Sequence, residues 1–285
     1  MNLESLWSQT QTELQARRAI VVATIVRDSG SVPRRVGTKM LIFADGKTSG
    51  TIGGGAFEDV VRCDALASLA SRQSITQEYL FRPEPRTPAP EPRASARTFG
   101  AICGGRVEVF LEVLMPRERL IICGGGHCGR ALAQAASLLD WDIVVCDDRD
   151  EFARSESWGY PNISQVVHLS SDAREVPDVD ESTFIALVGK GAGIDEAVLR
   201  RVLNSNAAYI GMIGSRRKRE TVFSNLRGDG ISQEILSRVQ APIGLDIGAE
   251  TPAEIAISIL AQIIAIRAGI RKKENVGSGE EETLY

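Results

Sequence analysis

A glycine-rich turn between an apolar segment and an alanine-rich segment is the feature that most constrains the fold of this chain. Residues 119–123 are apolar and predict a strand, and residues 131–139 have the composition and spacing of a helix. Between them, Gly124, Gly126 and Gly129 satisfy the pattern G-x-G-x-x-G. One glycine permits the turn, the next lets a pyrophosphate approach the backbone, and the third lets helix and strand pack closely. The segment therefore predicts a Rossmann-like turn that binds a dinucleotide-type anion at the start of the helix.

The residues around this turn support the same prediction. A second apolar segment, residues 143–146, ends in Asp147, and Rossmann proteins place a ribose-binding acid about 20 residues beyond the glycines. Such an acid disfavours a 2′-phosphate, so NAD is expected over NADP. His127 lies inside the turn, and we expect its ring to face the bound anion rather than to catalyse a reaction. The alternative is a Rossmann fold whose crevice is empty or repurposed, since a fold does not fix a ligand.

Length and charge exclude several other classes of protein. The 285 residues suffice for one large or two ordinary domains with a substantial core. With 33 basic against 37 acidic side chains the formal net charge is -4, so no overall positive field attracts nucleic acid or an anionic membrane. No segment reaches the roughly 18 apolar residues of a membrane span, and the first residues lack a basic signal region. The sequence predicts a cytoplasmic protein that binds neither nucleic acid nor membrane.

The chain is predicted to be α/β and to form two domains. Residues 1–115 mix helical segments with short apolar strands and predict a smaller N-terminal α+β domain. Within it, residues 83–97 combine five prolines with charged side chains and predict an exposed, mobile loop. Residues 116–270 alternate predicted strands and helices, as a C-terminal Rossmann-like parallel sheet requires. Residues 271–285 are charged and lack apolar periodicity, and they predict a disordered tail.

The last predicted helix indicates how the protein could assemble. Thr251 is a suitable N-cap, Pro252 fits the first helical position, and Glu254 follows three residues after the cap. Residues 255–266 are apolar nearly all round, so one face is expected to cover the sheet and another to meet a second copy of the chain in a homodimer. Complete burial within one chain is the alternative.

A second glycine-rich segment precedes a predicted helix in the first domain. Gly53, Gly54 and Gly55 are consecutive, and Glu58 lies about one turn into the helix. Backbone amides in such a loop can surround an oxyanion or the edge of a heterocycle. The alternative is a tight connection between strand and helix, with Glu58 facing solvent.

The cysteines are expected to be reduced, because their number is odd and no C-x-x-C pair is present. Cys103 precedes Gly104 and Gly105, so a ligand can approach the backbone beside a thiol that could be reactive. Cys128 lies at the start of the helix after the glycine turn, where the helix dipole favours a thiolate. The other cysteines are expected to be buried small hydrophobic residues: Cys63, Cys123 and Cys146.

Other motif classes find little support. His127 and His168 have no neighbours at metal-ligand spacing, so no metal site is expected. Residues 216–218 place cations in the first turn of a predicted helix, which opposes the helix dipole and indicates phosphate or an acidic protein patch. A solvated helix face is the alternative. The motifs of serine hydrolases, P-loop enzymes and zinc proteases are missing from the sequence.

Several segments together resemble the XdhC/CoxI family. In the first domain these segments are Gly30-Ser-Val-Pro-Arg-Arg-Val-Gly37, Ile52-Gly-Gly-Gly55 with Glu58, and Cys103-Gly-Gly-Arg-Val-Glu-Val-Phe-Leu-Glu112. In the second they are Gly126-His-Cys-Gly-Arg130, Asp147-Asp-Arg-Asp-Glu-Phe152, Tyr209-Ile-Gly-Met-Ile-Gly-Ser-Arg-Arg-Lys-Arg219 and Ala241-Pro-Ile-Gly-Leu-Asp-Ile-Gly-Ala-Glu-Thr-Pro252. The sequence departs from the family at Ala56, where members often carry cysteine, and at residues 190–195, where they often carry histidine.

The resemblance implies an accessory chaperone without turnover of its own. Such a protein binds molybdenum cofactor, as molybdopterin or its dinucleotide form, and shelters it during sulfuration by a cysteine desulfurase. It then inserts the cofactor into a molybdenum hydroxylase of the xanthine dehydrogenase type. The residues expected to bind the cofactor are Gly53, Gly54, Gly55, Glu58, Cys103, Gly104, Gly105, Gly124, Gly126, His127, Gly129 and Asp147.

Two other functions remain open from the sequence. The same glycine pattern and Asp147 fit an NAD(P)-dependent oxidoreductase, although the sequence offers no obvious proton donor. They also fit a nucleotide-sensing Rossmann protein without chemistry of its own.

Overall fold

The protein is described by a computed structural model that covers residues 3–82, 97–100, 104–160 and 162–269. The chain divides into two compact units, Met1–Pro116 and Arg117–Tyr285. The structure is α/β, as the sequence predicts, with an antiparallel sheet in the first unit and a parallel sheet in the second. Within the described residues, no helix is both long enough and apolar enough to cross a membrane. The predicted tail lies outside the described residues.

The first unit contains a six-stranded sheet with the order β3-β2-β1-β6-β4-β5. Its strands are β1 (Ile20–Gly30), β2 (Lys39–Phe43), β3 (Thr48–Gly50), β4 (Ile75–Arg82), β5 (Arg97–Gly100) and β6 (Gly105–Leu114). Neighbouring strands are antiparallel except β4 and β5, which are parallel. Residues 83–96 of the predicted loop lie outside the described residues. Arg97 is in β5, so the loop prediction is wrong at that position.

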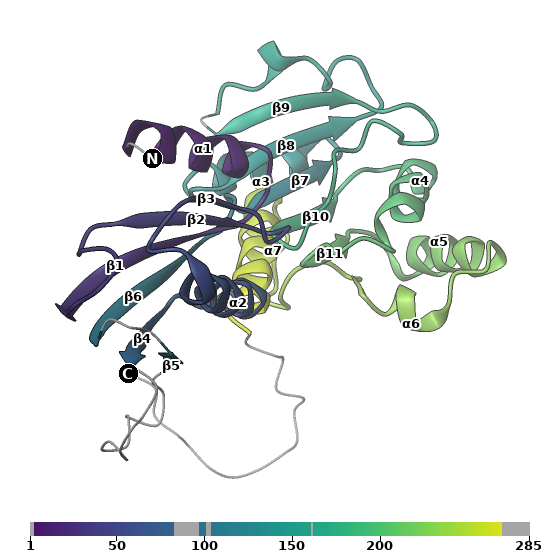
Figure 1. The fold of residues 1–285 in the computed structure, drawn as a ribbon. Helices are drawn as coiled ribbons and strands as arrows, with labels where there is room; N and C mark the ends of the chain where they lie inside the picture. The colour runs from purple at the N-terminus through teal and green to yellow at the C-terminus, as the bar shows by residue number, and fades with distance from the viewer. Residues whose placement is uncertain (1–2, 83–96, 101–103, 161, 270–285) are drawn as a thin grey trace, which may run out of the picture. The chain divides into compact units, whose positions relative to one another are not determined.

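The apolar side chains of β1 point alternately to the two faces of the sheet, which explains why both faces are covered. Val21 and its alternate neighbours pack against α2 (Gly55–Ser71), whereas Ile20 and Val22 pack with Leu6 of α1 (Leu3–Gln15). Successive side chains of a strand point to opposite faces, so a continuously apolar strand needs two covering layers. The two helices accordingly lie on opposite faces of the sheet (Figure 1).

The second unit is a parallel sheet in the order of a Rossmann fold. Its strands are β7 (Arg119–Cys123), β8 (Asp142–Asp147), β9 (Ile163–His168), β10 (Thr183–Leu187), β11 (Tyr209–Met212) and β12 (Val239–Gln240). They run β9-β8-β7-β10-β11-β12, with every pair parallel. The strand order reverses between β7 and β10, and ligands of such sheets bind outside the carboxyl ends of the strands at this switch point.

Helices cover both faces of the parallel sheet. α3 (His127–Ala136) and α7 (Pro252–Arg267) pack on one face, and α4 (Ala192–Val202), α5 (Arg216–Gly228) and α6 (Gln233–Leu236) pack on the other (Figure 1). The segment that joins β8 to β9 contains a 3₁₀ turn, Ser155–Ser157. The predicted start of α7 is confirmed, because Thr251 Oγ1 accepts from the Glu254 N–H and Glu254 accepts from the Thr251 N–H at 2.8 Å.

Candidate functional site

The glycine turn after β7 packs as its sequence pattern requires. A Cβ on Gly124 would lie 2.5 Å from the Gly189 nitrogen, and a Cβ on Gly129 would overlap the Gly124 carbonyl oxygen. Both positions therefore need glycine for packing within the protein. Gly126 differs, because the nearest atom to a Cβ there is Arg149 Nη2 at 4.0 Å. Gly126 is the N-cap of α3, so a ligand can approach the backbone at a helix N-terminus.

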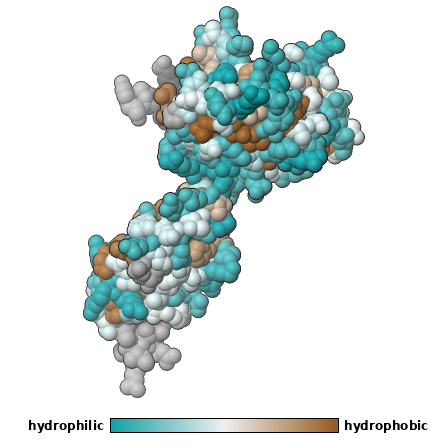
Figure 2. Space-filling model, turned by 90° about the horizontal axis from the view of Figure 1, so that it is seen from above, coloured by the Kyte–Doolittle hydropathy of each residue, from teal (hydrophilic) through white to brown (hydrophobic). Residues whose placement is uncertain are grey.

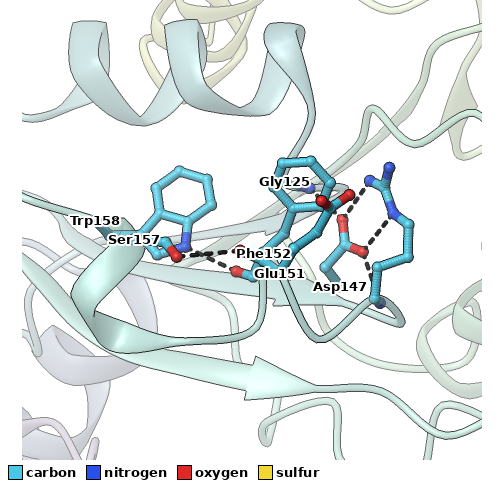
Figure 3. A network of polar contacts seen from close by, with 7 residues as sticks. Gly125, Asp147, Glu151, Phe152, Ser157 and Trp158 are labelled. Atoms are coloured by element: carbon cyan, nitrogen blue, oxygen red, sulfur yellow. Dashed lines mark hydrogen bonds and ion pairs between the residues drawn. The ribbon is translucent and has the colours of Figure 1, made fainter.

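Asp147 lies at the end of β8 with its carboxylate turned into the protein (Figure 3). Oδ2 accepts from the Gly125 N–H at 2.5 Å and from Arg149 Nη2 at 2.8 Å. Oδ1 accepts from the Arg149 N–H and Nε, both at 2.9 Å. Burial raises the pKa of Asp147, but the hydrogen bonds from Arg149 and Gly125 outweigh it and hold that pKa below its usual value. In this state Asp147 is an ionised anchor for Arg149, and protein donors occupy both oxygens.

Arg149 places a cation beside the start of α3. Its guanidinium lies 4.1 Å from the centre of the Phe152 ring and 42% of its side chain is exposed. Phe152 is itself held in place, because its carbonyl accepts from Trp158 Nε1 at 2.8 Å (Figure 3). The ion pair and the stacking fix the guanidinium while leaving one side open. Sequence reasoning missed Arg149, although a cation two residues after the acid was a visible signal.

A cavity of about 350 Å³ opens at the carboxyl ends of the parallel strands. It is lined by Cys123, Gly124, Cys146, Asp147, Asp148, Arg149, Leu169, Gly189, Lys190, Gly191, Gly193 and Ile194. These residues follow or end β7, β8, β9 and β10, so the cavity lies at the topological switch point. Its size is within the range of small-molecule sites, about 300–1,000 Å³.

A buried ion pair that the sequence analysis did not identify supports one wall of this cavity. Lys218 Nζ of α5 lies 2.6 Å from Oδ2 of Asp195 in α4, and it donates to the Gly189 carbonyl at 2.9 Å. Asp195 is fully buried, and burial raises its pKa to about 6 although Lys218 lowers it. The pair ties two helices to the loop after β10. The alternative of a solvated helix face therefore fails for Lys218, whose side chain is only 15% exposed, whereas Arg216 and Arg217 are exposed.

The two histidines and Cys128 have different environments. His127 is exposed at the first position of α3. Cys128 is half-buried and packs against the apolar cluster shared by α3 and α7. His168 is exposed and its Nε2 lies 3.2 Å from Asp150. Within the described residues, no group of three or more histidine, cysteine or acidic side chains could hold a metal ion.

The glycine segments of the first unit also come together. Gly30 of β1 pairs with Gly105 at the start of β6, and a Cβ on Gly53 would lie 2.6 Å from Cγ of Pro33. The loop after β1 therefore contacts both the loop before α2 and the start of β6. A Cβ on Gly104 would meet no atom of the described residues within 4 Å. Cys103 lies outside the described residues.

Glu58 fills the anion-binding loop that precedes α2. Its Oε1 accepts from the N–H groups of Ile52, Gly53 and Gly54 at 2.9, 3.0 and 2.8 Å, and from the Thr51 hydroxyl. Burial raises the pKa of Glu58, but these hydrogen bonds outweigh it and the pKa lies below its usual value. Glu58 is therefore not turned to solvent, and these amides bind the chain's own carboxylate.

Removing this carboxylate is expected to lower the stability of the first unit. Glu58→Ala leaves three amides and a hydroxyl without their acceptor, which costs about 1–3 kcal/mol in free energy of unfolding. Glu58→Gln keeps an acceptor oxygen and is expected to lose less. Because the folded-state pKa is depressed, the contribution of Glu58 is present at neutral pH and is lost as the pH falls through that value. Urea unfolding at pH 7 and pH 3.5 measures both effects; equal stability of Glu58→Ala and wild type would contradict them.

Two of the remaining cysteine predictions are confirmed and one is wrong. Cys123 and Cys146 are buried, but Cys63 is exposed. Phe57, Val61 and Ala65 form the buried face of α2 at intervals of four residues. Cys63 lies two residues from Val61 and so faces the opposite side of the helix.

Comparison with known proteins agrees with this architecture. The model of the XdhC Rossmann domain matches residues 120–263, and that of the XdhC and CoxI family matches residues 13–79. The chain is 35% identical over 266 residues to "Uncharacterized protein YqeB" of Escherichia coli K12, covering 91% of this chain and 46% of that protein. It is 27% identical over 166 residues to a probable xanthine dehydrogenase component of Bacillus subtilis 168, covering 56% of this chain and 46% of that protein.

A third relative is more distant but similar in length. The chain is 22% identical over 297 residues to "Molybdenum cofactor insertion chaperone PaoD" of Escherichia coli K12, covering 89% of this chain and 85% of that protein. By contrast, the chain spans about half the length of the first two relatives. Matches to family models in both units, on segments that also form the glycine sites, establish that this chain belongs to the XdhC and CoxI family.

Proposed function

We propose that this protein is an accessory chaperone that binds molybdenum cofactor and inserts it into a molybdenum hydroxylase of the xanthine dehydrogenase type. The observation that carries the proposal is the cavity at the switch point of the parallel sheet, where Gly126 and Arg149 leave an open approach to the start of α3. The family membership and the name of the third relative supply the class of cargo. The proposal also includes protection of the cofactor during sulfuration by a cysteine desulfurase. The protein is proposed to act in the cytoplasm.

The crevice suits the phosphate-bearing part of such a cargo. Backbone N–H groups at the start of α3 and the guanidinium of Arg149 are donors to an anion. The adjoining cavity combines glycine backbone and the aliphatic side chains of Leu169 and Ile194 with charged residues such as Lys190, and this mixture suits a flat heterocycle with polar edges. In the first unit, Gly53, Gly54, Gly55 and Gly104 are proposed as further cofactor-binding residues. His127 at the start of α3 and Asp147, which accepts from the Gly125 N–H, are proposed to support cofactor binding through the glycine turn.

The decisive experiment compares cargo and nucleotides on the same protein. Purified protein is titrated with molybdenum cofactor and, separately, with NAD and NADH, and the loaded protein is then mixed with an apo-hydroxylase. The proposal requires cofactor binding and recovery of hydroxylase activity without consumption of a nucleotide. Hydride transfer to or from NAD(P) without cofactor transfer would instead establish the oxidoreductase alternative. Binding of NAD alone, without either activity, would establish the nucleotide sensor.

Arg149 provides a specific test of the crevice. Arg149→Ala removes a charge-assisted hydrogen-bond donor worth about 1.5–3 kcal/mol, so cofactor affinity is expected to fall roughly 10- to 100-fold. Arg154→Ala is the matched control, because Arg154 is an exposed arginine of the same connecting segment. Equilibrium binding of the two variants checks the prediction. Equal affinities would place the phosphate elsewhere.

We also propose that the protein is a homodimer formed through α7. Ile257 and Ile264 of this helix are 58% and 36% exposed, so α7 keeps apolar surface beyond what the sheet buries. The surface seen in Figure 2 is largely hydrophilic, with apolar side chains gathered in places. Exposed apolar surface on a helix is typical of a contact between protomers. Sedimentation equilibrium tests the proposal, and a monomer at micromolar concentration would refute it.

A further inference from the structure

Two thiols lie side by side at the floor of the crevice. Cys123 ends β7 and Cys146 lies on β8, and the two are partners in the parallel register. Both belong to the apolar cluster on the α4 face of the sheet, so their side chains lie on the same face. Both are buried, and both line the 350 Å³ cavity. Neither residue is used in the proposed binding of the cofactor phosphate.

The nearby carboxylates are paired with cations, except for one buried oxygen. Lys218 Nζ lies 2.6 Å from Asp195 Oδ2, and Arg149 Nη2 lies 2.8 Å from Asp147 Oδ2. Asp195 is fully buried, and no hydrogen bond from a described residue reaches its Oδ1. A Cβ on Gly189 would lie 3.7 Å from this oxygen, and Gly189 lines the same cavity as the two thiols.

We propose that Cys123 and Cys146 bind a soft monovalent metal cation of the Cu⁺ type, in two-coordinate geometry. Neighbouring strands are about 4.8 Å apart, and thiolate–metal bonds are about 2.3 Å long in zinc sites. Two such bonds end to end match the separation of in-register side chains on adjacent strands. Soft thiolate ligands select soft cations such as Cu⁺.

The surroundings exclude the more common zinc site at this place. Zinc takes four ligands in structural sites and three in catalytic ones, and no third ligand of this kind joins the two thiols among the described residues. On binding, the cation forms two metal–sulfur bonds and both thiol protons leave to solvent. The site then carries one more negative charge than the free dithiol.

Silver ion is a suitable probe, because it is a soft monovalent cation that stays in one oxidation state. The protein for the test carries Cys63→Ser, Cys103→Ser and Cys128→Ala, so that only Cys123 and Cys146 remain. Isothermal titration in two buffers of different ionisation enthalpy is expected to show one Ag⁺ per chain and release of two protons. Removing either remaining thiol is expected to weaken binding by more than about 100-fold, because the second thiolate binds at high effective concentration.

The controls separate binding from loss of the fold. Cys146→Ala and Cys123→Val keep small apolar residues in the core, and circular dichroism with thermal unfolding verifies that each variant is folded. The inference is overturned if a folded single-thiol variant binds Ag⁺ as tightly as the dithiol protein. It is also overturned if the dithiol protein takes up Ag⁺ only after unfolding. Neither result depends on delivery of molybdenum cofactor, so the test stands apart from the proposed function.

Discussion

Replacing Lys218 with methionine is expected to destabilise the second unit by about 3–5 kcal/mol at alkaline pH, where Asp195 is ionised in the variant. The change leaves Asp195 as a fully buried carboxylate without its counter-ion. It also removes the donor to the Gly189 carbonyl, so the loop after β10 loses its tie to α5. Urea unfolding at about pH 9 measures the loss. Arg217→Met is the matched control on the same helix, and it is expected to change stability by less than about 0.5 kcal/mol because Arg217 is exposed.

The pH dependence of the stability of Lys218→Met identifies Asp195 as the cause of the loss. The folded-state pKa of Asp195 is about 6, above the unfolded value near 3.9. Folded protein therefore binds the proton more tightly, and ionised Asp195 lowers stability at pH values above its folded pKa. Loss of Lys218 raises this pKa further, so the deficit of the variant is full above the new value and shrinks as the pH falls through it. A deficit independent of pH between 8 and 5 would contradict this explanation. Adding Asp195→Asn is expected to restore much of the stability.

Gly126→Val is expected to weaken cargo binding strongly while leaving the fold intact. The backbone at Gly126 has φ −69° and ψ −163°, which other residues also adopt, and no atom lies closer than 4.0 Å to a Cβ there. The added side chain instead occupies the approach to the start of α3. Steric conflict of about 3 kcal/mol lowers affinity roughly 100-fold. Equilibrium binding of molybdenum cofactor, with circular dichroism as the check on folding, measures both parts of the prediction.

Gly129→Ala is the informative companion variant. It belongs to the same motif, but its Cβ would overlap the Gly124 carbonyl oxygen, so β7 and α3 could not keep their packing. We expect this variant to lose stability rather than affinity alone. If Gly126→Val binds cofactor normally, the crevice does not hold the cargo, even if the protein remains a chaperone. If Gly129→Ala is as stable as wild type, β7 and α3 do not pack as closely as the structure shows.

The Rossmann unit could be predicted from sequence because its signals are local. An apolar strand, a glycine turn and a helix at residues 119–139 fix one βα unit, and the capping residues around Thr251 mark the start of α7. Such patterns depend on neighbours within a few residues. β12, with only two residues, and β9, whose exposed positions interrupt its apolar pattern, gave no comparable signal.

The candidate site was predicted less completely because its important contacts are long-range. Asp195 and Lys218 lie on different helices, and no spacing rule relates them. Arg149 and Asp147 are only two residues apart in the sequence, but the glycine pattern assigns Asp147 to the ribose of a dinucleotide. Glu58 was noticed as an acid near a glycine loop, yet whether it faced the amides or solvent depends on side-chain conformation. Sequence patterns locate backbone turns better than they locate the partners of charged side chains.

The hydrogen bonds to Glu58 reduce the number of amides that the first unit offers to an anion. The amides of Ile52, Gly53 and Gly54 already surround a fixed internal anion, so these three donors are not available to an incoming phosphate. Under the proposed function, binding of negative charge therefore depends on the Rossmann unit, where 42% of the Arg149 side chain is exposed.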